Sequence, residues 1–518
     1  MSDFEELLPR YRGTVVELVL QAALRWPSRA ALICGEAAIS YADYGHAVIA
    51  LAARIREIGK PKRVAVVMPN GPGACVAHFG VLAAGAQLLP MNPAYTPKEL
   101  AFQLRDAQCG AIVADAVLHA LVEPLAEELG LQILWLNAAE KGRADARADG
   151  QRLPARVDPD ALGILQYTGG TSGRPKGVNL SHAALRTNVA QREALLPTRE
   201  AAETILCAMP LFHSYGMAMG LYLAARCAGT LVVLPAFRRD DVFDAIERHR
   251  ITILPGSPSI YVSLMAHPRF ASTDWSSLCV CYSGASALPV PVLAQWEQTV
   301  RVQIFEGYGM TEAGPVLSFN GPLQPPKAGS VGLPLPGTEI QVVDAETGMQ
   351  RLGAGQCGEI RARGPQIMQG YRNLPAESAQ ALRDGWLHTG DLGEFDTDGY
   401  LFIRGRKKDL IIVGGYNVYP REVEEVLLEH PSVLEAAVVG APDSYLGEVL
   451  HAYVVPRPGA GHDGEALMRH CAQRIVRYKQ PAHYHWLDEL PKTGINKIDK
   501  KALGILAGSA AQKGPSPC

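Results

Sequence analysis

The residues best suited to chemistry form one glycine-rich stretch, residues 167–177, with the sequence YTGGTSGRPKG. Its four glycines let successive backbone N–H groups converge on an anion, because no Cβ stands in the way. Thr168, Thr171 and Ser172 add hydroxyl donors, and Lys176 adds a point charge suited to phosphate. A flexible surface turn is the plainer alternative, and the density of these side chains argues against it. The stretch therefore predicts a loop that holds a polyphosphate.

The stretch differs from the phosphate-binding loops of the commonest nucleotide-binding folds. Those loops place Lys-Ser or Lys-Thr directly after the last glycine, at the start of a helix. Here Pro175 separates Arg174 from Lys176, and Gly177 follows, so a helix cannot begin in that way. No Gly-x-Gly-x-x-Gly sequence opens a helix either. We therefore expect a fold other than a kinase-like or dinucleotide-binding one.

The composition indicates a soluble globular enzyme of two or more domains, since 518 residues exceed the usual single-domain size. A net charge of −3 argues against a nucleic-acid partner held by a broad basic surface. The ten cysteines show neither a C-x-x-C pair nor zinc-like spacing, so we expect reduced thiols. No apolar run reaches the roughly 18–20 residues of a membrane span, and the acidic N-terminus lacks an export signal. We therefore expect a cytoplasmic protein without a transmembrane segment.

Apolar runs and helix-like segments alternate along the first part of the chain. Residues 14–60 carry apolar residues at helical spacing, and we expect them to be helical. The alternation beyond them predicts an α/β fold of largely parallel sheets covered by helices. Motifs directly after strands would then lie at the carboxyl ends, where ligands bind in such sheets. The expected strands are 64–68, 87–90, 111–114, 131–134, 161–166, 204–208, 230–234, 251–254, 278–282 and 302–306.

The character of the chain changes from about residue 329. Glycine and proline become more frequent and Asp-Gly turns appear, so we expect a small region of antiparallel sheet over 339–403. A polar break at 405–409 precedes a further pattern of strands and helices, enough for a compact α+β domain. The expected domains are 1–405 and 410–505, and residues 506–518 are expected to form a disordered tail.

Six further motifs follow one another in the chain, and together they resemble those of the adenylate-forming superfamily. This superfamily contains acyl-CoA synthetases, the adenylation domains of peptide synthetases, and luciferases. The resemblance covers about residues 10–505 and is closest to the fatty-acyl and aryl-CoA ligases. Each motif alone is a weak signal, but their shared order is specific. The motifs are 210–216 (PLFHSYG), 282–288 (YSGASAL), 306–312 (EGYGMTE), 386–391 (WLHTGD), 405–409 (GRKKD) and 491–500 (PKTGINKIDK).

The chemistry of this superfamily explains why these residue types are needed. A carboxylate is a poor acyl donor, so it first attacks the α-phosphate of ATP, which releases pyrophosphate and leaves an acyl-adenylate. A thiol then displaces AMP. The first step brings an anion to a polyanion, which requires charge neutralisation and in-line positioning. The resemblance implies that the β- and γ-phosphates are held by Thr168, Gly169, Gly170, Thr171, Ser172, Gly173 and Lys176.

The resemblance also implies which residues surround the reacting atoms. Thr311 would contact the α-phosphate, and Glu312 with Thr171 would bind Mg²⁺, which prefers hard oxygen ligands and substrate phosphates. A surface acid is the plainer alternative for Glu312. Lys497 would be the main catalytic cation, bridging the carboxylate and the α-phosphate. Asn496 stands where the superfamily usually has glycine, and asparagine tolerates a left-handed backbone better than other residues.

For the nucleoside, the resemblance implies a slot with small backbone turns on one side and a stacking aromatic ring on the other. Asp391 would accept hydrogen bonds from the ribose hydroxyls, with Arg406 donating nearby. A core aromatic is the plainer alternative for Tyr308, and an Asx turn is the plainer alternative for Asp391. The residues of the expected adenine slot are Gly284, Ala285, Ser286, Glu306, Gly307 and Tyr308.

The charged segment 406–409 resembles the hinge of the superfamily, with Lys408 at the pivot. There the C-terminal domain swings between an adenylation pose and a thioester-forming pose. The second pose would bring Gly414, Gly415 and Tyr416 to the active site, where glycines let the pantetheine arm of CoA pass close to the backbone. Without the resemblance, Lys408 would be read as part of a solvated turn.

His213 resembles the gate between the acyl pocket and the pantetheine tunnel, although a core histidine is the plainer alternative. Amino-acid-activating relatives place aspartate after the corresponding phenylalanine, whereas here His213 follows Phe212, so an α-amino acid is not expected. The apolar pocket wall favours a fatty, alicyclic or aromatic acid. The expected pocket residues are Phe212, His213, Tyr215, Met217, Gly309 and Met310.

The sequence therefore predicts an ATP-dependent carboxylic acid–CoA ligase that uses Mg²⁺ with ATP and takes CoA as co-substrate. One alternative is a stand-alone acyl-AMP ligase that loads a carrier protein. Another is a non-catalytic nucleotide-binding homologue. Whether the chain forms a homodimer stays open.

Overall fold

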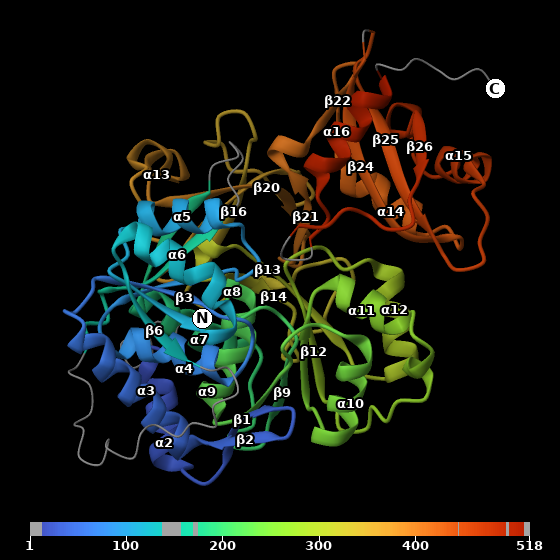
Figure 1. The fold of residues 1–518 in the computed structure, drawn as a ribbon. Helices are drawn as coiled ribbons and strands as arrows, with labels where there is room; N and C mark the ends of the chain where they lie inside the picture. The colour runs from blue at the N-terminus through green and yellow to red at the C-terminus, as the bar shows by residue number, and fades with distance from the viewer. Residues whose placement is uncertain (1–12, 137–156, 169–174, 444, 494–496, 512–518) are drawn as a thin grey trace.

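The computed structural model describes residues 13–136, 157–168, 175–443, 445–493 and 497–511. Figure 1 shows a large domain, coloured from blue through yellow to orange-brown, and a smaller orange-red domain that lies beside the end of the large domain carrying β20 and β21. Strand β21 (Leu401–Arg406) is the last strand of the large domain and leads into the small one. This arrangement confirms the predicted α/β fold with a smaller C-terminal α+β domain.

The largest sheet has nine strands in the order β15-β14-β13-β12-β11-β9-β10-β1-β2. Its central strands, from β13 to β1, are parallel neighbours, whereas β2, β14 and β15 pair antiparallel at the edges. The strands are β1 (Ala30–Cys34), β2 (Ala37–Ser40), β9 (Thr204–Cys207), β10 (Thr230–Val233), β11 (Ile253–Gly256), β12 (Val280–Ser283), β13 (Ile304–Gly309), β14 (Val316–Phe319) and β15 (Leu333–Pro334).

A second sheet has seven strands in the order β18-β8-β7-β4-β3-β5-β6. The strands from β7 to β6 are parallel, whereas β8 and β18 are antiparallel additions beside β7. The strands are β3 (Arg63–Val67), β4 (Gln87–Met91), β5 (Ala111–Asp115), β6 (Gln132–Leu136), β7 (Leu162–Thr168), β8 (Lys176–Ser181) and β18 (Gly370–Tyr371).

Two smaller sheets lie towards the C-terminus. The first, in the order β16-β17-β20-β19 with β21 on β20, is antiparallel, and the second, β23-β22-β25-β24 with β26 on β25, forms the small domain. The strands are β16 (Glu339–Val343), β17 (Gly358–Arg363), β19 (Leu382–Arg383), β20 (Trp386–Phe395), β22 (Ile411–Val413), β23 (Tyr416–Val418), β24 (Val433–Asp443), β25 (Gly447–Pro456) and β26 (His483–Trp486).

The helices cover these sheets, and no helix among the described residues is long and apolar enough to cross a bilayer. The longer helices are α2 (Val16–Arg25), α3 (Tyr41–Glu57), α4 (Pro72–Ala83), α5 (Pro97–Ala107), α6 (His119–Leu129), α7 (His182–Leu195), α10 (Arg239–His249), α11 (Pro258–Met265), α12 (Val290–Val300), α13 (Pro375–Ala381), α14 (Pro420–Leu428), α15 (Gly464–Ala472) and α16 (Lys500–Ala511). The shorter ones are α8 (Ser214–Gly216), the π-helical turn η3 (Met217–Tyr222), α9 (Leu223–Cys227), and the 3₁₀ turns η1 (Ala116–Leu118), η4 (Pro268–Ala271), η5 (Thr311–Ala313), η6 (Lys407–Asp409) and η7 (Arg477–Lys479).

Helix α4 shows how the core is built. All of its residues are buried, and the sequence is apolar on every side, as expected of a helix enclosed in the core of a large protein. Phe79 on this helix is fully buried and packs edge-on against Tyr44 and tilted against Tyr222. Helix α4 thereby joins α3 to the segment that follows the His213 motif.

Two expectations from the sequence are wrong at the level of single elements. Residues 30–40 are not helical but form the hairpin β1–β2, which turns at Gly35 (φ 57°) and extends the edge of the largest sheet by pairing with β10. Helical spacing of small apolar residues misled the prediction there. The expected disordered tail begins too early, because residues 506–511 belong to α16, whose Leu503 and Ala507 are buried against the small domain. The residues from 512 onward lie outside the described part.

We expect Phe79→Ala to lower the free energy of unfolding by about 3–5 kcal/mol, because it removes a fully buried ring between two aromatic partners and leaves a cavity. Urea unfolding followed by tryptophan fluorescence would measure this loss. Leu24→Ala is the matched control: Leu24 is 74% exposed, so its truncation is expected to change stability by less than about 0.5 kcal/mol. Equal losses in both variants would contradict the packing described here.

Candidate active site

The carboxyl ends of neighbouring parallel strands bring three of the predicted motifs together. Strands β9, β11, β12 and β13 are adjacent, with Ser283 opposite Glu306, so the loops that follow them emerge at one edge of the sheet. The loop after β9 carries His213, the loop after β12 carries Gly284, and the loop after β13 carries Thr311. A direct contact joins the first and third, because Ser214 Oγ lies 3.4 Å from Thr311 Oγ1. Motifs nearly 100 residues apart therefore share one site.

The glycine-rich stretch connects two antiparallel strands, as expected of a loop that does not open a helix. Thr168 at the end of β7 pairs with Lys176 at the start of β8, which closes the base of the loop. Residues 169–174 lie outside the described part of the chain. The phosphate contacts expected of Gly169, Gly170, Thr171, Ser172 and Gly173 therefore stay predictions.

A tyrosine that the sequence analysis missed links the phosphate loop to the expected metal-binding acid. Tyr371 lies in β18, beside β8, and its ring faces Lys176 Nζ at 4.9 Å. The Tyr371 hydroxyl donates to Glu312 Oε1 at 2.9 Å. Burial raises the pKa of Glu312, although this hydrogen bond to Tyr371 acts against the shift. Tyr371 lies 59 residues from Glu312 in the sequence, so no spacing pattern could have found it.

Asp391, expected to bind ribose, lies buried between an aromatic and a cationic neighbour. Its Oδ2 accepts a hydrogen bond of 2.6 Å from the Tyr308 hydroxyl, and its Oδ1 lies 3.2 Å from Arg406 Nε. Burial raises the pKa of Asp391, and the guanidinium of Arg406 works against that rise. The attraction of Asp391 raises the pKa of Arg406 in turn. The structure thus brings together three residues that the resemblance assigned to the nucleoside.

Lys497 reaches this group from the small domain. Burial lowers the pKa of its ammonium, the positive charge of Arg406 lowers it further, and the carboxylates of Asp391 and Glu312 act in the opposite direction. Burial, together with the nearby charge of Lys497, lowers the pKa of the His213 imidazole to about 3, so His213 is neutral. The neutral ring accepts a hydrogen bond from Tyr215 N at Nδ1, 3.2 Å away. A lysine and a histidine from different domains therefore meet at the same site.

The expected adenine slot is a pair of tightly packed turns. Ala285 has φ 73°, a left-handed conformation that costs a non-glycine residue of the order of 1–3 kcal/mol and is typical of functional loops. Glu306 stabilises the segment that follows Ala285, because its Oε1 accepts a hydrogen bond of 2.8 Å from Leu288 N. Burial raises the pKa of Glu306 to about 7, while Arg421 of the small domain lowers it. Glu306 shapes the turn rather than lining its surface.

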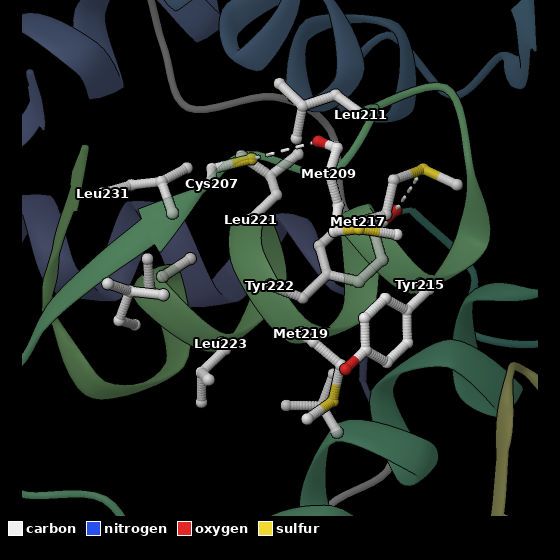
Figure 2. Packing of buried hydrophobic residues seen from close by; sticks show 14 of the residues in the cluster. Cys207, Met209, Leu211, Tyr215, Met217, Met219, Leu221, Tyr222, Leu223 and Leu231 are labelled. Carbon is white, nitrogen blue, oxygen red and sulfur yellow. Dashed lines mark hydrogen bonds between the residues drawn. The ribbon is translucent and has the colours of Figure 1, made fainter. Parts of the chain in front are cut away.

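The expected acyl-pocket residues fall into two groups. Tyr215 is buried, and its ring packs on Gly284 so closely that a Cβ there would lie 2.8 Å from the ring. Gly309 is equally constrained, because a Cβ would lie 1.9 Å from Pro315 O. Met217 lies elsewhere, in the wall of an apolar cavity beneath Ser214. Tyr215 and Met217 therefore lie on consecutive helical segments (Figure 2), whereas Gly309 ends strand β13, and of these three residues Met217 alone lines the cavity.

The loop expected to guide pantetheine is not at this site. Gly414 (φ 56°) and Gly415 (φ 85°) form a turn whose following residue, Tyr416, is 59% exposed and stacks on Tyr478 of the same domain at 4.5 Å. Lys408 lies in η6, directly after β21. The structure thus shows Lys497 near the large domain's acids and the Gly414–Tyr416 turn exposed.

Within the described residues, no group of three or more His, Cys, Asp or Glu side chains is placed to hold a metal ion. The chemistry of Glu312 nevertheless fits Mg²⁺, which binds through one or two carboxylates together with substrate phosphates and water. Its buried carboxylate accepts a hydrogen bond from Tyr371, whose ring also faces Lys176 at the base of the expected phosphate loop.

The site thus combines a lysine of the small domain with buried carboxylates of the large domain, beside a loop suited to phosphate. Comparison with family models agrees: residues 19–372 match the AMP-binding enzyme family, and residues 422–497 match the AMP-binding enzyme C-terminal domain. The chain therefore belongs to the AMP-binding, adenylate-forming enzymes, which confirms the resemblance drawn from its motifs.

Relatives that match nearly the full chain include several acid–CoA ligases. The chain is 36% identical to a long-chain-fatty-acid–CoA ligase of Bacillus subtilis, covering 97% of this chain and 96% of that enzyme. It is also 36% identical to a feruloyl-CoA synthase of Amycolatopsis, covering 92% and 95%. The structure of o-succinylbenzoate CoA synthetase from Bacillus subtilis with its acyl-adenylate intermediate matches with a TM-score of 0.81 at 30% identity, over 94% of this chain and 97% of that one. These matches place the chain among the AMP-forming acyl- and aryl-CoA ligases.

Glu306→Gln tests the buried acid beneath the expected adenine slot, since glutamine can still accept from Leu288 N but cannot ionise. The raised pKa means that folded wild-type protein keeps a proton that the unfolded chain releases, so wild-type stability falls as pH rises from 4.5 to about 7. Between pH 4.5 and about 7, we therefore expect the free energy of unfolding of the variant to increase by up to about 3 kcal/mol relative to that of the wild type. Urea unfolding at pH 4.5, 6 and 8 measures the difference, and a difference independent of pH would contradict the raised pKa.

Proposed function

We propose that this ligase converts a carboxylic acid and ATP into an acyl-adenylate and then transfers the acyl group to CoA. The observation that carries the proposal is the position of Lys497, which the small domain brings to Asp391, Glu312, Arg406 and His213 of the large domain. A related synthetase whose structure holds an acyl-adenylate, over nearly the same length of chain, supports it.

In the first step, a carboxylate oxygen would attack the α-phosphorus of ATP while the bond to pyrophosphate breaks. The two reactants repel each other, so the site must supply positive charge where they meet. Lys497 fits this need. Burial and the charge of Arg406 disfavour its protonated form, and an anion that enters the site would stabilise that form. Lys176, at the base of the glycine-rich loop, would act on the departing pyrophosphate, with Thr311 beside the α-phosphate.

Magnesium fits the first step through Glu312. When bound, the ion would neutralise phosphate charge between the triphosphate and this carboxylate. Tyr371 would hold the carboxylate in place through its hydrogen bond to Oε1. Thr171, the second residue expected near the metal, lies outside the described part of the chain.

In the second step, the thiolate of CoA would attack the acyl carbonyl carbon and AMP would leave. The exposed turn at Gly414 supports a second pose of the small domain for this step. Four large apolar side chains, two beside the turn and two on a second segment, are exposed in the present pose: Ile412, Tyr416, Tyr445 and Leu446. A hydrogen bond from Gly414 N to Leu446 O (2.7 Å) joins the two segments that carry them. Docking of this face on the large domain would bury it, with rotation about residues 406–409.

The acid is a fatty, alicyclic or aromatic one in this proposal. The walls around Met217 are apolar, and the relatives named above act on a long-chain fatty acid and on ferulic acid. Loading of a carrier protein instead of CoA is the second candidate acceptor. Measuring pyrophosphate release over a panel of acids, with and without CoA, distinguishes the two, since CoA should speed turnover only if it is the acceptor.

Lys497→Ala is expected to lower the rate of adenylate formation by at least about 100-fold, because it removes the cation at the reacting atoms. Acid-dependent exchange of pyrophosphate into ATP measures this step alone. Lys492→Ala is the matched control: Lys492 precedes Lys497 in the same segment, but its Nζ pairs with Glu435 at 3.2 Å within the small domain. Wild-type exchange in the Lys497 variant would contradict the mechanism, as would equal losses in both variants.

Lys408→Pro tests the proposed hinge. Proline fixes φ and would restrict rotation at η6, so we expect pyrophosphate exchange to stay within about twofold of wild type while thioester formation falls at least about tenfold. Single-turnover transfer from preformed acyl-adenylate to CoA measures the second step. An equal loss in both half-reactions would show that residue 408 does not serve the domain rotation.

A further inference from the structure

Arg421 is a largely buried cation that the reaction described above does not use. It lies in the first turn of α14, and its side chain is 11% exposed. Its Nη1 donates to the backbone oxygen of Ile403 at 2.7 Å, and Ile403 belongs to β21 of the large domain. Figure 1 shows β21 and α14 on the two sides of the domain boundary. Arg421 therefore connects the two domains through a hydrogen bond from a charged donor.

This hydrogen bond spans the expected hinge. Ile403 precedes residues 406–409 in the chain and Arg421 follows them, so a swing of the small domain about the hinge separates the two groups. A second contact at the same boundary has this property. The hydroxyl of Tyr419, the residue before α14, donates to the thiol of Cys357 in the large domain. The start of α14 is thus tied to the large domain by contacts that belong to the present pose.

The guanidinium of Arg421 is oriented for this contact by its own helix. Its Nε donates to Glu425 Oε1 at 2.8 Å, one turn along α14, and this pair is independent of the domain pose. The acceptor lies on β21, which pairs with β20 alone among the described strands, and an edge strand presents backbone groups without strand partners. A charged donor makes a hydrogen bond about twice as strong as a neutral one, so this single contact favours the docked pose.

Helix α14 is also tied to the segment that carries Lys497. Glu424, on this helix, accepts a hydrogen bond of 2.6 Å from Lys500 Nζ, three residues after Lys497. On its other side Lys497 is held by Thr493, whose N–H donates to the Lys497 backbone oxygen at 2.7 Å. Contact of α14 with β21 therefore keeps Lys497 near Asp391.

We propose that Arg421 is a positioning residue for adenylate formation, whose hydrogen bond to Ile403 selects the pose in which Lys497 reaches the site. The inference rests on the proposed two-step ligation and adds that loss of this bond favours the thioester-forming pose. Only contacts that differ between two poses shift the balance between them, and the pair with Glu425 does not differ. The competing explanation is that Arg421 merely stabilises α14 through this pair.

Arg421→Met tests the inference with the full-length enzyme, because methionine keeps the apolar stem and removes every donor. We expect acid-dependent pyrophosphate exchange to fall at least about tenfold, the loss expected for one hydrogen bond to a charged group. Single-turnover transfer from preformed acyl-adenylate to CoA should stay within about twofold of wild type or rise, since this step uses the other pose. The ratio of the two rates comes from one protein preparation, so partial misfolding does not affect it.

Arg474→Met is the matched control. Arg474 pairs with Glu429 at 3.1 Å and donates to His470 O at 3.3 Å, so it makes the same two kinds of contact as Arg421, but entirely within the small domain. Both rates should stay within about twofold of wild type in this variant. Wild-type exchange in Arg421→Met, an equal fall in its two rates, or the same change in the Arg474 variant would each overturn the inference.

A Glu306→Gln background separates the hydrogen bond from a purely electrostatic role. Burial raises the pKa of Glu306 and Arg421 acts against that rise, so a second route from Arg421 to the site runs through this carboxyl. We expect Arg421→Met to cause the same fall in exchange in this background. A fall that disappears there means that Arg421 acts through the charge of Glu306, and the inference is then wrong. If no acid supports exchange in the wild type, the proposed function fails first and the inference falls with it.

Discussion

The burial of carboxylates at one edge of the largest sheet is the constraint on which the rest of the site depends. Glu312 and Asp391 are almost fully enclosed, and burial raises the pKa of both. Within the large domain, hydrogen bonds from Tyr308 and Tyr371 and the positive charge of Arg406 stabilise the ionised form of these carboxylates. Lys497, which belongs to the small domain, adds a further positive charge near both carboxylates. The architecture of two domains is therefore inseparable from the electrostatics of the site.

Most of the fold could be predicted because its signals are local. Buried parallel strands are short continuous apolar runs, and each expected run from 64–68 to 302–306 coincides with a strand of one of the two large sheets. The two wrong predictions concern segments whose local pattern fits more than one structure. In residues 30–40 small apolar residues fit helical spacing equally well, and pairing with β10, which lies 200 residues away, decides the outcome. Helix α16 was missed because its glycines and small residues resemble a tail, although Leu503 and Ala507 pack on β24.

The site could be predicted only where its residues lie in motifs. Asp391, Arg406 and Lys497 each belong to a recognisable stretch, and the structure brings them together. Tyr371 belongs to no such stretch, and it reaches Glu312 through a contact across 59 residues. This contact arises from packing between distant segments, which the spacing of residues along the chain does not contain.

Docking of the small domain is also linked to protonation of the large one. Arg421, in the first turn of α14, donates to Ile403 O at 2.7 Å and lowers the pKa of the buried Glu306. Glu425, on the same helix and paired with Arg421, acts on the pKa of Glu306 in the opposite direction. The charge of the buried Glu306 and the charged residues of α14 are therefore electrostatically coupled across the two domains, and such coupling is reciprocal. Because Glu306 also accepts the hydrogen bond that holds the turn of Leu288, one buried carboxyl connects the small domain electrostatically with the expected adenine slot.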